Sequence, residues 1–196
     1  MRSTRHLPAR VWVIVVGLLL ATSAADGAII WSGLTTSFSK ASFTDHTQPQ
    51  NQDRITDTVW LTRAATQGLF NIHTESSYAA TSPAGTRWAT DINNAGKTIA
   101  AANWADLAFT DWITAYGGTG TTQLPSRLIG RDAVVHLVQE GVYLDLRFTS
   151  WDSGSGPGGF AYQRAEGVIP EPASVSAALL LAALVSLRPH RRVMPL

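Results

Sequence analysis

The stretch that most constrains the fold is Val142 to Thr149, where apolar and polar side chains alternate at every position. The apolar set is Val142, Leu144, Leu146 and Phe148, and the polar set is Tyr143, Asp145, Arg147 and Thr149. Successive side chains of a β-strand point to opposite faces, so this pattern predicts a strand with one buried face and one face toward solvent.

The segments on either side of this strand extend the prediction to a sheet. Ala133 to Gln139 is an apolar, β-branched run, and Glu140-Gly141 is typical of a two-residue hairpin turn in which glycine supplies the positive φ. After a glycine-rich connection at 153–159, Phe160 to Arg164 returns as a third strand. We expect an antiparallel meander within an all-β domain, an antiparallel sandwich or a jelly-roll-like domain.

Weaker β signals precede this region. We expect strands over 29–38, 55–63 and 69–73, a loop over 44–51 and a turn over 81–86, which contains Pro83 and Gly85. In the second strand Ile55, Asp57, Val59 and Leu61 would share one face, with Trp60 on the other.

The segment 98–116 fits two structures. Trp104, Ala108, Trp112 and Ala115 recur at helical spacing, whereas 105–112 also fits a strand. We predict the strand because Asp106 to Trp112 and Asp145 to Trp151 share the pattern Asp-Leu-x-Phe-Thr-x-Trp.

The repeat suggests a candidate binding face. In a strand, Leu and Phe of each copy would point to the core, and Asp, Thr and Trp would point away from it. Asp106, Trp112, Asp145 and Trp151 would then form a glycan-binding face, because an indole stacks on the C–H face of a sugar ring while carboxylates bind its hydroxyl groups. The alternative is that both tryptophans pack under loops at the strand ends.

Both ends of the chain are apolar segments flanked by arginine. Residues 1–25 have a basic start, an apolar run over 11–21 and small residues before position 25, which predicts a secretory signal peptide. At the other end, residues 169–196 contain Pro170-Glu171-Pro172, an uncharged run over 173–187 and a basic cluster of Arg188, Arg191 and Arg192. As a helix the uncharged run is about 22 Å long at ~1.5 Å per residue, a short span for a hydrocarbon core of about 30 Å.

This order of Pro-Glu-Pro, short apolar helix and arginine cluster resembles the PEP-CTERM sorting signal of exported bacterial proteins. The resemblance is confined to the tail. It implies cleavage near Glu171 by the membrane transpeptidase exosortase, with signal peptidase as the other partner during export and with the arginine end in the cytoplasm. The implied organisation is a precursor held transiently in the inner membrane and a mature domain, residues 26–168, at the cell surface or outside the cell.

The charge of the mature domain argues against nucleic acid as a partner. Between Ile29 and Ile169 nine Lys and Arg residues face twelve Asp and Glu residues, a net charge of −3, although the whole chain carries +1. The chain has no cysteine, which excludes thiol catalysis and cysteine-based zinc sites.

Few residues suggest catalysis. His46, His73 and His136 lack metal-ligand spacing, and no phosphate loop, nucleophile elbow or His-Glu-x-x-His motif occurs. Asp53 and Asp57 lie four residues apart, a weak indication of a glycosidase pair or of a calcium site. No metal or cofactor is expected.

Three functions stay open on the sequence alone. The first is a non-catalytic surface or matrix protein associated with extracellular polysaccharide. The second is a secreted glycan-active enzyme, which would need acids such as Asp53, Asp57 or Asp152 to meet in one cleft. The third is a self-associating structural protein that assembles through exposed edge strands.

Overall fold

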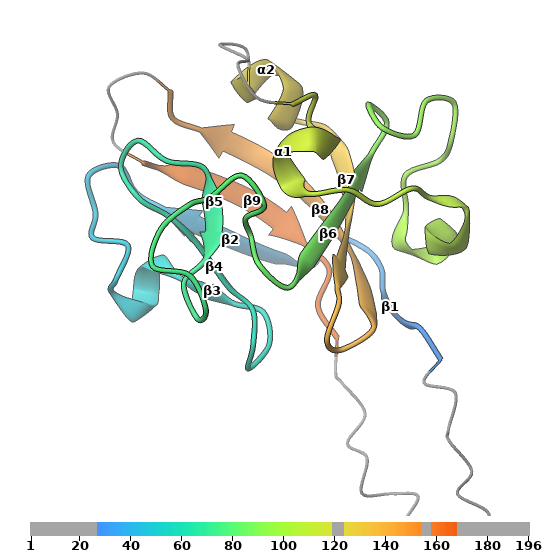
Figure 1. Ribbon diagram of the computed structural model, residues 1–196, viewed down its shortest axis with the longest axis horizontal. Coiled ribbons are helices and arrows are strands. Elements are labelled where there is room, and N and C mark those ends of the chain that lie inside the picture. The colour runs from blue at the N-terminus through green and yellow to red at the C-terminus, as the bar shows by residue number, and fades with distance from the viewer. Residues whose placement is uncertain (1–26, 119–123, 154–157, 168–196) are drawn as a thin grey trace, which may run out of the picture.

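The computed structural model describes residues 27–118, 124–153 and 158–167, and in these ranges the chain is mainly antiparallel β-sheet with a few short helices (Figure 1). The all-β class expected from the alternating pattern is confirmed. None of the helices in these ranges is long and apolar enough to span a membrane. The expected signal helix and the expected transmembrane helix of the tail lie outside the described residues.

The larger sheet has six strands. They are β1 (Ile29–Trp31), β2 (Thr36–Lys40), β6 (Thr86–Thr90), β7 (Asp132–Leu137), β8 (Val142–Trp151) and β9 (Phe160–Arg164). Five of them follow the order β2-β9-β8-β7-β6, and β1 pairs in parallel with the first residues of β8. The long strand β8 is therefore the centre of the sheet, in contact with β7, β9 and β1.

The smaller sheet and the helices complete the domain. The smaller sheet has the order β3 (Asp53–Arg54), β4 (Trp60–Arg63), β5 (Leu69–Asn71). The helices are η1 (Pro49–Asn51), η2 (Ala101–Asp106), α1 (Trp112–Ala115) and α2 (Leu124–Leu128). Leu61 and Leu69 of the smaller sheet share one hydrophobic core with Leu144 and Phe148 of the larger sheet, so the two sheets form a sandwich-like arrangement.

The alternation in β8 holds as predicted. Val142, Leu144, Leu146 and Phe148 are buried, and the residues between them are partly or fully exposed. A shift in the pairing with β9 between Phe148 and Ser150 then changes the alternation. Because a bulge inserts an extra residue, Trp151 lies on the interior side together with Phe148.

The connection between β7 and β8 is longer than predicted. Leu137 pairs with Val142, so the connection has four residues, 138–141, in place of the expected two. Gly141 does supply the expected positive φ, of 65°. The amide of Val138 donates to the carbonyl of Gly85, 2.9 Å away, so the chain still bonds to the β6 side of the sheet after its pairing with β8 has ended.

The predicted strand over 29–38 is two strands. Gly33 has φ of 85°, a left-handed conformation that ends β1 and redirects the chain into β2. As a result β1 pairs with β8, whereas β2 runs antiparallel to β9.

The strand expected over 55–63 begins only at Trp60. The amide of Ile55 donates to the carbonyl of Val59, and the Thr56 hydroxyl accepts from the amide of Val59, which makes 55–59 a tight turn. Asp57 is exposed in this turn, which explains the polar residue within an apolar pattern. The strand expected over 69–73 is the shorter β5.

The loop over 44–51 and the turn over 81–86 are found nearly as expected. The loop contains the single-turn helix η1, and β6 already begins at Thr86. The pattern over β6 did not indicate a strand, because three of its five residues, Trp88 to Thr90, are buried in succession.

The strand predicted over 105–112 is wrong, and so is the continuous helix that was its alternative. This segment contains the end of η2, an extended stretch with one isolated bridge between Thr110 and Trp88, and the start of α1. Asp111 starts α1 because its side chain accepts from the amide of Thr114 at 3.0 Å. Leu107 is buried with Ala101 against Val134, so the segment covers the outer face of the larger sheet and is not one of its strands.

Candidate functional site

A groove of about 510 Å³ lies where β6 ends and β7 begins. One wall is the loop after β6, with Asp91 and residues 97–99, and the other is the segment 129–132 that leads from α2 into β7. The walls are adjacent because Thr90 pairs with Ala133. A smaller hollow continues from Ile99 and Asp132 across β8 to Asp145 and Arg147.

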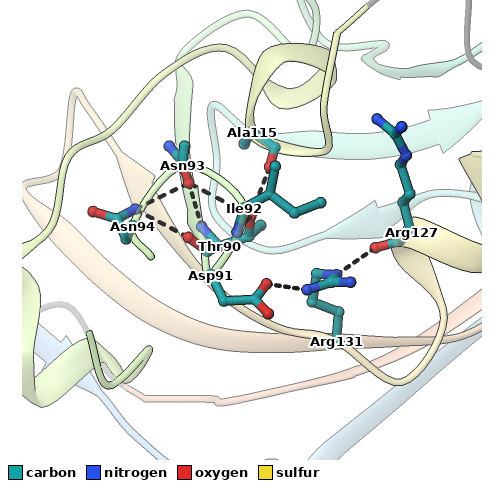
Figure 2. A network of polar contacts seen from close by, with 8 residues as sticks. All are labelled: Thr90, Asp91, Ile92, Asn93, Asn94, Ala115, Arg127 and Arg131. Carbon is teal, nitrogen blue, oxygen red and sulfur yellow. Dashed lines mark hydrogen bonds and ion pairs between the residues drawn. The ribbon is translucent and has the colours of Figure 1, made fainter. Parts of the chain in front are cut away.

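Polar side chains hold the first wall in shape, as Figure 2 shows. The Asn93 side-chain oxygen accepts from the amide of Thr90 at 2.8 Å, and the Asn94 side chain donates to the Thr90 carbonyl at 3.1 Å. The Thr90 hydroxyl donates to the carbonyl of Ala115 at 2.6 Å, which ties this turn to α1. The turn places Asp91 toward the opposite wall.

Both carboxylates that line the groove have an arginine partner, and the ammonium group of Lys97, which also lines it, donates to the backbone carbonyl of Asp106. Asp91 is bonded to Arg131, whose Nε also donates to the Arg127 carbonyl at 2.8 Å (Figure 2). Asp132 accepts from Nε of Arg147 at 2.7 Å, across the β7–β8 pair. Both pairs are partly exposed to solvent, so each contributes little to stability, about 0–1 kcal/mol. Their carboxylates have guanidinium partners, which is unlike the arrangement of a catalytic acid pair.

Two isoleucines add apolar surface to the groove. Ile129 is 43% exposed, and Ile99 is half-buried between the groove and the small cluster around Leu107. The groove therefore offers hydrogen-bonding groups on both walls and apolar surface between them, without a large excess of one charge. This suits a neutral polar ligand better than an ion.

Tyr116 lies in the core close to the groove. Burial raises the pKa of its hydroxyl well above the ordinary value; the positive charge of Arg131 opposes this rise, and the weaker effects of Asp91 and Asp132 add to it. The hydroxyl has no hydrogen-bond partner within the part of the chain that the structure describes. Tyr116 therefore acts as a buried apolar group at neutral pH.

The placement expected for the glycan-binding face is wrong. Trp112 and Trp151 do come together, with ring centroids 5.4 Å apart, but they are only 1% and 7% exposed and belong to the core. Trp112 is the first residue of α1, and Trp151 is turned inward by the bulge in β8. The alternative, that both tryptophans pack under loops at strand ends, is right in that both are buried, although Trp112 begins a helix.

The two aspartates of that face lie elsewhere. Asp145 is on the outer side of β8, where its carboxylate accepts from the amides of Ala101 at 2.6 Å and Gly33 at 3.0 Å. It thereby holds η2 and the β1–β2 corner against the sheet. Asp106 is exposed at the end of η2. The four residues thus do not share a surface.

The acids considered for an enzyme do not meet in one cleft. Asp53 is buried against Arg164 and Tyr162, Asp57 is exposed in its turn, and Asp152 accepts a hydrogen bond from Ser42. Asp53 is bonded to Arg164, the last residue of β9. Asp152 follows Trp151, which pairs with Phe160, the first residue of β9. The two acids are therefore separated by most of that strand, roughly 13 Å at ~3.3 Å per residue.

The histidines are also apart, each against an aromatic ring. His46 lies beside Phe70, His73 beside Trp60 and His136 on Tyr143, with ring centroids 5.8, 4.7 and 4.2 Å apart. Burial lowers the pKa of His136, so its ring is neutral at pH 7. No group of three or more potential metal ligands occurs in the described ranges.

An aromatic row on the outer face of the larger sheet was not predicted. Tyr143 stacks between His136 and Trp104, at 4.2 and 4.5 Å, and Phe109 packs edge-on against Tyr143. All four rings are partly exposed. The alternation in β8 predicted that Tyr143 points outward. The stacking of Trp104 on its ring could not be predicted, because only the fold brings η2 to this face of the sheet.

The sorting residues Pro170, Glu171 and Pro172 and the basic cluster Arg188, Arg191 and Arg192 lie outside the described residues. No protein-family model matches the chain, and no curated protein or solved structure matches it either.

Proposed function

We propose that this chain is the precursor of a non-catalytic exported protein that exosortase delivers to the cell surface or extracellular matrix. Signal peptidase and exosortase are its processing partners, and the tail serves as a transient membrane anchor. The proposal rests first on the order of Pro170-Glu171-Pro172, the uncharged run and the terminal arginines.

One structural observation supports the proposal. The two ends of the β domain lie together, since Gly167 packs so closely on Trp31 that a Cβ atom at residue 167 would be 2.4 Å from the indole. Neighbouring ends allow the apolar segments before and after the domain to enter the same membrane. A domain whose ends lay on opposite sides would have to be bridged by long linkers.

The proposal is tested by changing the tail. In the Glu171→Ala variant, and in the Arg191→Ala, Arg192→Ala double variant, we expect an uncleaved species that stays in the membrane fraction of a host with exosortase. The measurement is the mass and location of the chain by immunoblotting and mass spectrometry. Glu166→Ala is the matched control, because Glu166 is an exposed acid just before the tail. Normal processing of both tail variants would contradict the proposal.

For the mature domain we propose a neutral extracellular polysaccharide as the ligand of the groove beside Asp91. The observation behind this is the combination of paired charges with the exposed apolar surface of Ile129. On a glycan array, Arg131→Ala should lose the signal of the wild type, and Arg87→Ala, an exposed arginine outside the groove, should keep it. Equal binding by all three proteins would exclude the groove.

A further inference from the structure

The strand β2 lies at one end of the larger sheet. It pairs with β9 from Thr36 to Lys40, and on its other side it has no strand partner within the described residues. We call this free side the β2 edge. The amide and carbonyl groups along such an edge are available to another strand.

Two of the features that usually prevent pairing, a proline and a bulge, are missing from the β2 edge. Its sequence, Thr-Ser-Phe-Ser-Lys, contains no proline, and its register with β9 runs without a bulge. The only charged residue, Lys40, is turned inward, where it is 3% exposed and donates to the Gly158 carbonyl at 3.1 Å. Edge strands of soluble proteins commonly avoid association by an outward charge, a proline, a bulge or an inward-pointing charge. Lys40 is a charge of the last kind, but it lies at the end of β2 and its ammonium group is already bonded within the same molecule.

An exposed aromatic residue follows directly. Phe43, three residues after β2, is 87% exposed and has φ of 64°, a left-handed conformation that is strained for an aromatic residue. The turn is held by the Thr44 hydroxyl, which donates to the Ala41 carbonyl at 2.7 Å, and by the Ser42–Asp152 hydrogen bond. The surrounding bonds thus keep the ring in solvent, as expected for an anchor at an interface.

We propose that the β2 edge binds a second copy of this chain, with the two β2 strands antiparallel about a twofold axis. A twofold axis brings each group near its own counterpart, so a charged edge would repel itself. The exposed residues of the β2 edge, Ser37 and Ser39, are neutral, and the edge is thereby compatible with its own copy. The inference does not depend on the sorting route.

The pairing also gives Phe43 a contact. In a pair centred on Phe38, Lys40 of one copy lies opposite Thr36 of the other, so the turn that carries Phe43 comes near the residues that precede β2 of the other copy, among them the half-buried Leu34. The two exposed rings would each leave solvent at one end of the joint sheet.

The test is the oligomeric state of the full chain in detergent, by sedimentation velocity over a range of concentrations. We expect a dimer whose dissociation constant rises about tenfold or more in the Ser37→Lys, Ser39→Lys double variant, because four lysines then meet across the axis. Phe43→Ala should weaken the dimer as well. The control is Thr149→Lys, Ser150→Lys, which adds the same charge at exposed positions of the central strand β8.

Two other results of this experiment would contradict a dimer formed through the β2 edge. A monomer up to the solubility limit overturns the proposal. A dimer that the β2 lysines do not weaken assigns the association to another surface, for example the apolar segments, which every variant retains. Because the chain has no cysteine, a Ser37→Cys, Ser39→Cys variant gives a second readout. Oxidation should link two copies through β2, and failure to cross-link a dimeric sample would also overturn the proposal.

Discussion

The buried carboxylate of Asp53 connects the two sheets. It accepts from Nε and Nη2 of Arg164 at 2.7 and 2.9 Å and from the hydroxyl of Tyr162 at 2.7 Å. The Asp53 and Arg164 side chains are only 8% and 6% exposed, so neither charge has much access to water. Removing one partner of such a pair strongly destabilises the folded state, because the remaining charge stays buried without a partner.

We expect Asp53→Asn to lower the free energy of unfolding by about 3–5 kcal/mol, since Arg164 would lose its counter-charge. The matched control is Asp57→Asn, an exposed residue in a turn four positions away, for which the expected change is within about 0.5 kcal/mol. Both are measured by urea denaturation. Similar values for the two variants would show that the buried pair contributes nothing specific.

The two fully buried tyrosines predict how stability depends on pH. Burial raises the pKa of both Tyr116 and Tyr162 above the ordinary 10.0, and for Tyr162 the neighbouring Asp53 adds to the rise. A pKa raised in the folded state gives stability that is complete below the unfolded pKa and is lost as the pH rises toward the folded pKa. The contribution of the two tyrosines to the free energy of unfolding should thus be level up to about pH 9 and fall above about pH 10.

Tyr116→Phe should weaken this alkaline dependence without a loss at pH 7, because the Tyr116 hydroxyl has no partner among the described residues. Tyr162→Phe should also reduce the dependence, but with a loss of about 1.5–3 kcal/mol at pH 7 from its hydrogen bond to a charged group. Denaturation curves from pH 7 to 11 measure both effects. An unchanged alkaline slope in both variants would contradict the assignment.

At the scale of elements, the strand that was predicted best is the one with the most neighbours. The alternation in β8 identified its buried face, and β7 and β9 followed because they continue the same meander. The first copy of the repeat, Asp106 to Trp112, has nearly the same pattern but only one bridge to a strand, at Thr110. Local sequence indicates which residues are buried, as Leu107 is, but whether a segment becomes a strand depends on partners far away in the chain.

The groove could not be predicted for the same reason. Its walls are a loop after β6 and a segment after α2, which lie between 30 and 41 residues apart in the sequence and meet only because Thr90 pairs with Ala133. Neither wall has a motif of its own. The inward position of Trp151 was equally hidden, since it depends on a shift of pairing with β9.

The buried face of β8 gives a prediction for the element as a whole. Leu146 is 1% exposed at the centre of the larger sheet, and Leu146→Ala should lower the free energy of unfolding by about 2–5 kcal/mol through lost burial and the remaining cavity. Thr149→Ala, on the exposed side of the same strand, should change it by less than about 0.5 kcal/mol. Chemical denaturation compares the two. A loss below about 0.5 kcal/mol for Leu146→Ala would mean that this side chain does not belong to a tightly packed core.

At the scale of the whole molecule, both ends of the β domain leave from the same region. The amide of Ile29 donates to the carbonyl of Gly141 at 3.0 Å, and at the other end the amide of Ala165 donates to the carbonyl of Asp145 at 2.8 Å. Both bonds are made to the first half of β8 or to the turn before it, and Figure 1 shows the two ends on one side of the domain. The apolar segments that precede and follow the domain are thereby attached at neighbouring points.

This arrangement leads to a prediction about topology. Both apolar segments carry arginine at the end away from the domain, and such residues stay in the cytoplasm. The precursor should therefore cross the inner membrane twice, with both termini inside and the β domain outside. A reporter enzyme that works only in the cytoplasm should be active when fused after Leu196 and inactive when fused after Gly167. A reporter that works only in the periplasm should give the opposite result at both positions, and periplasmic activity after Leu196 would exclude the two-span precursor.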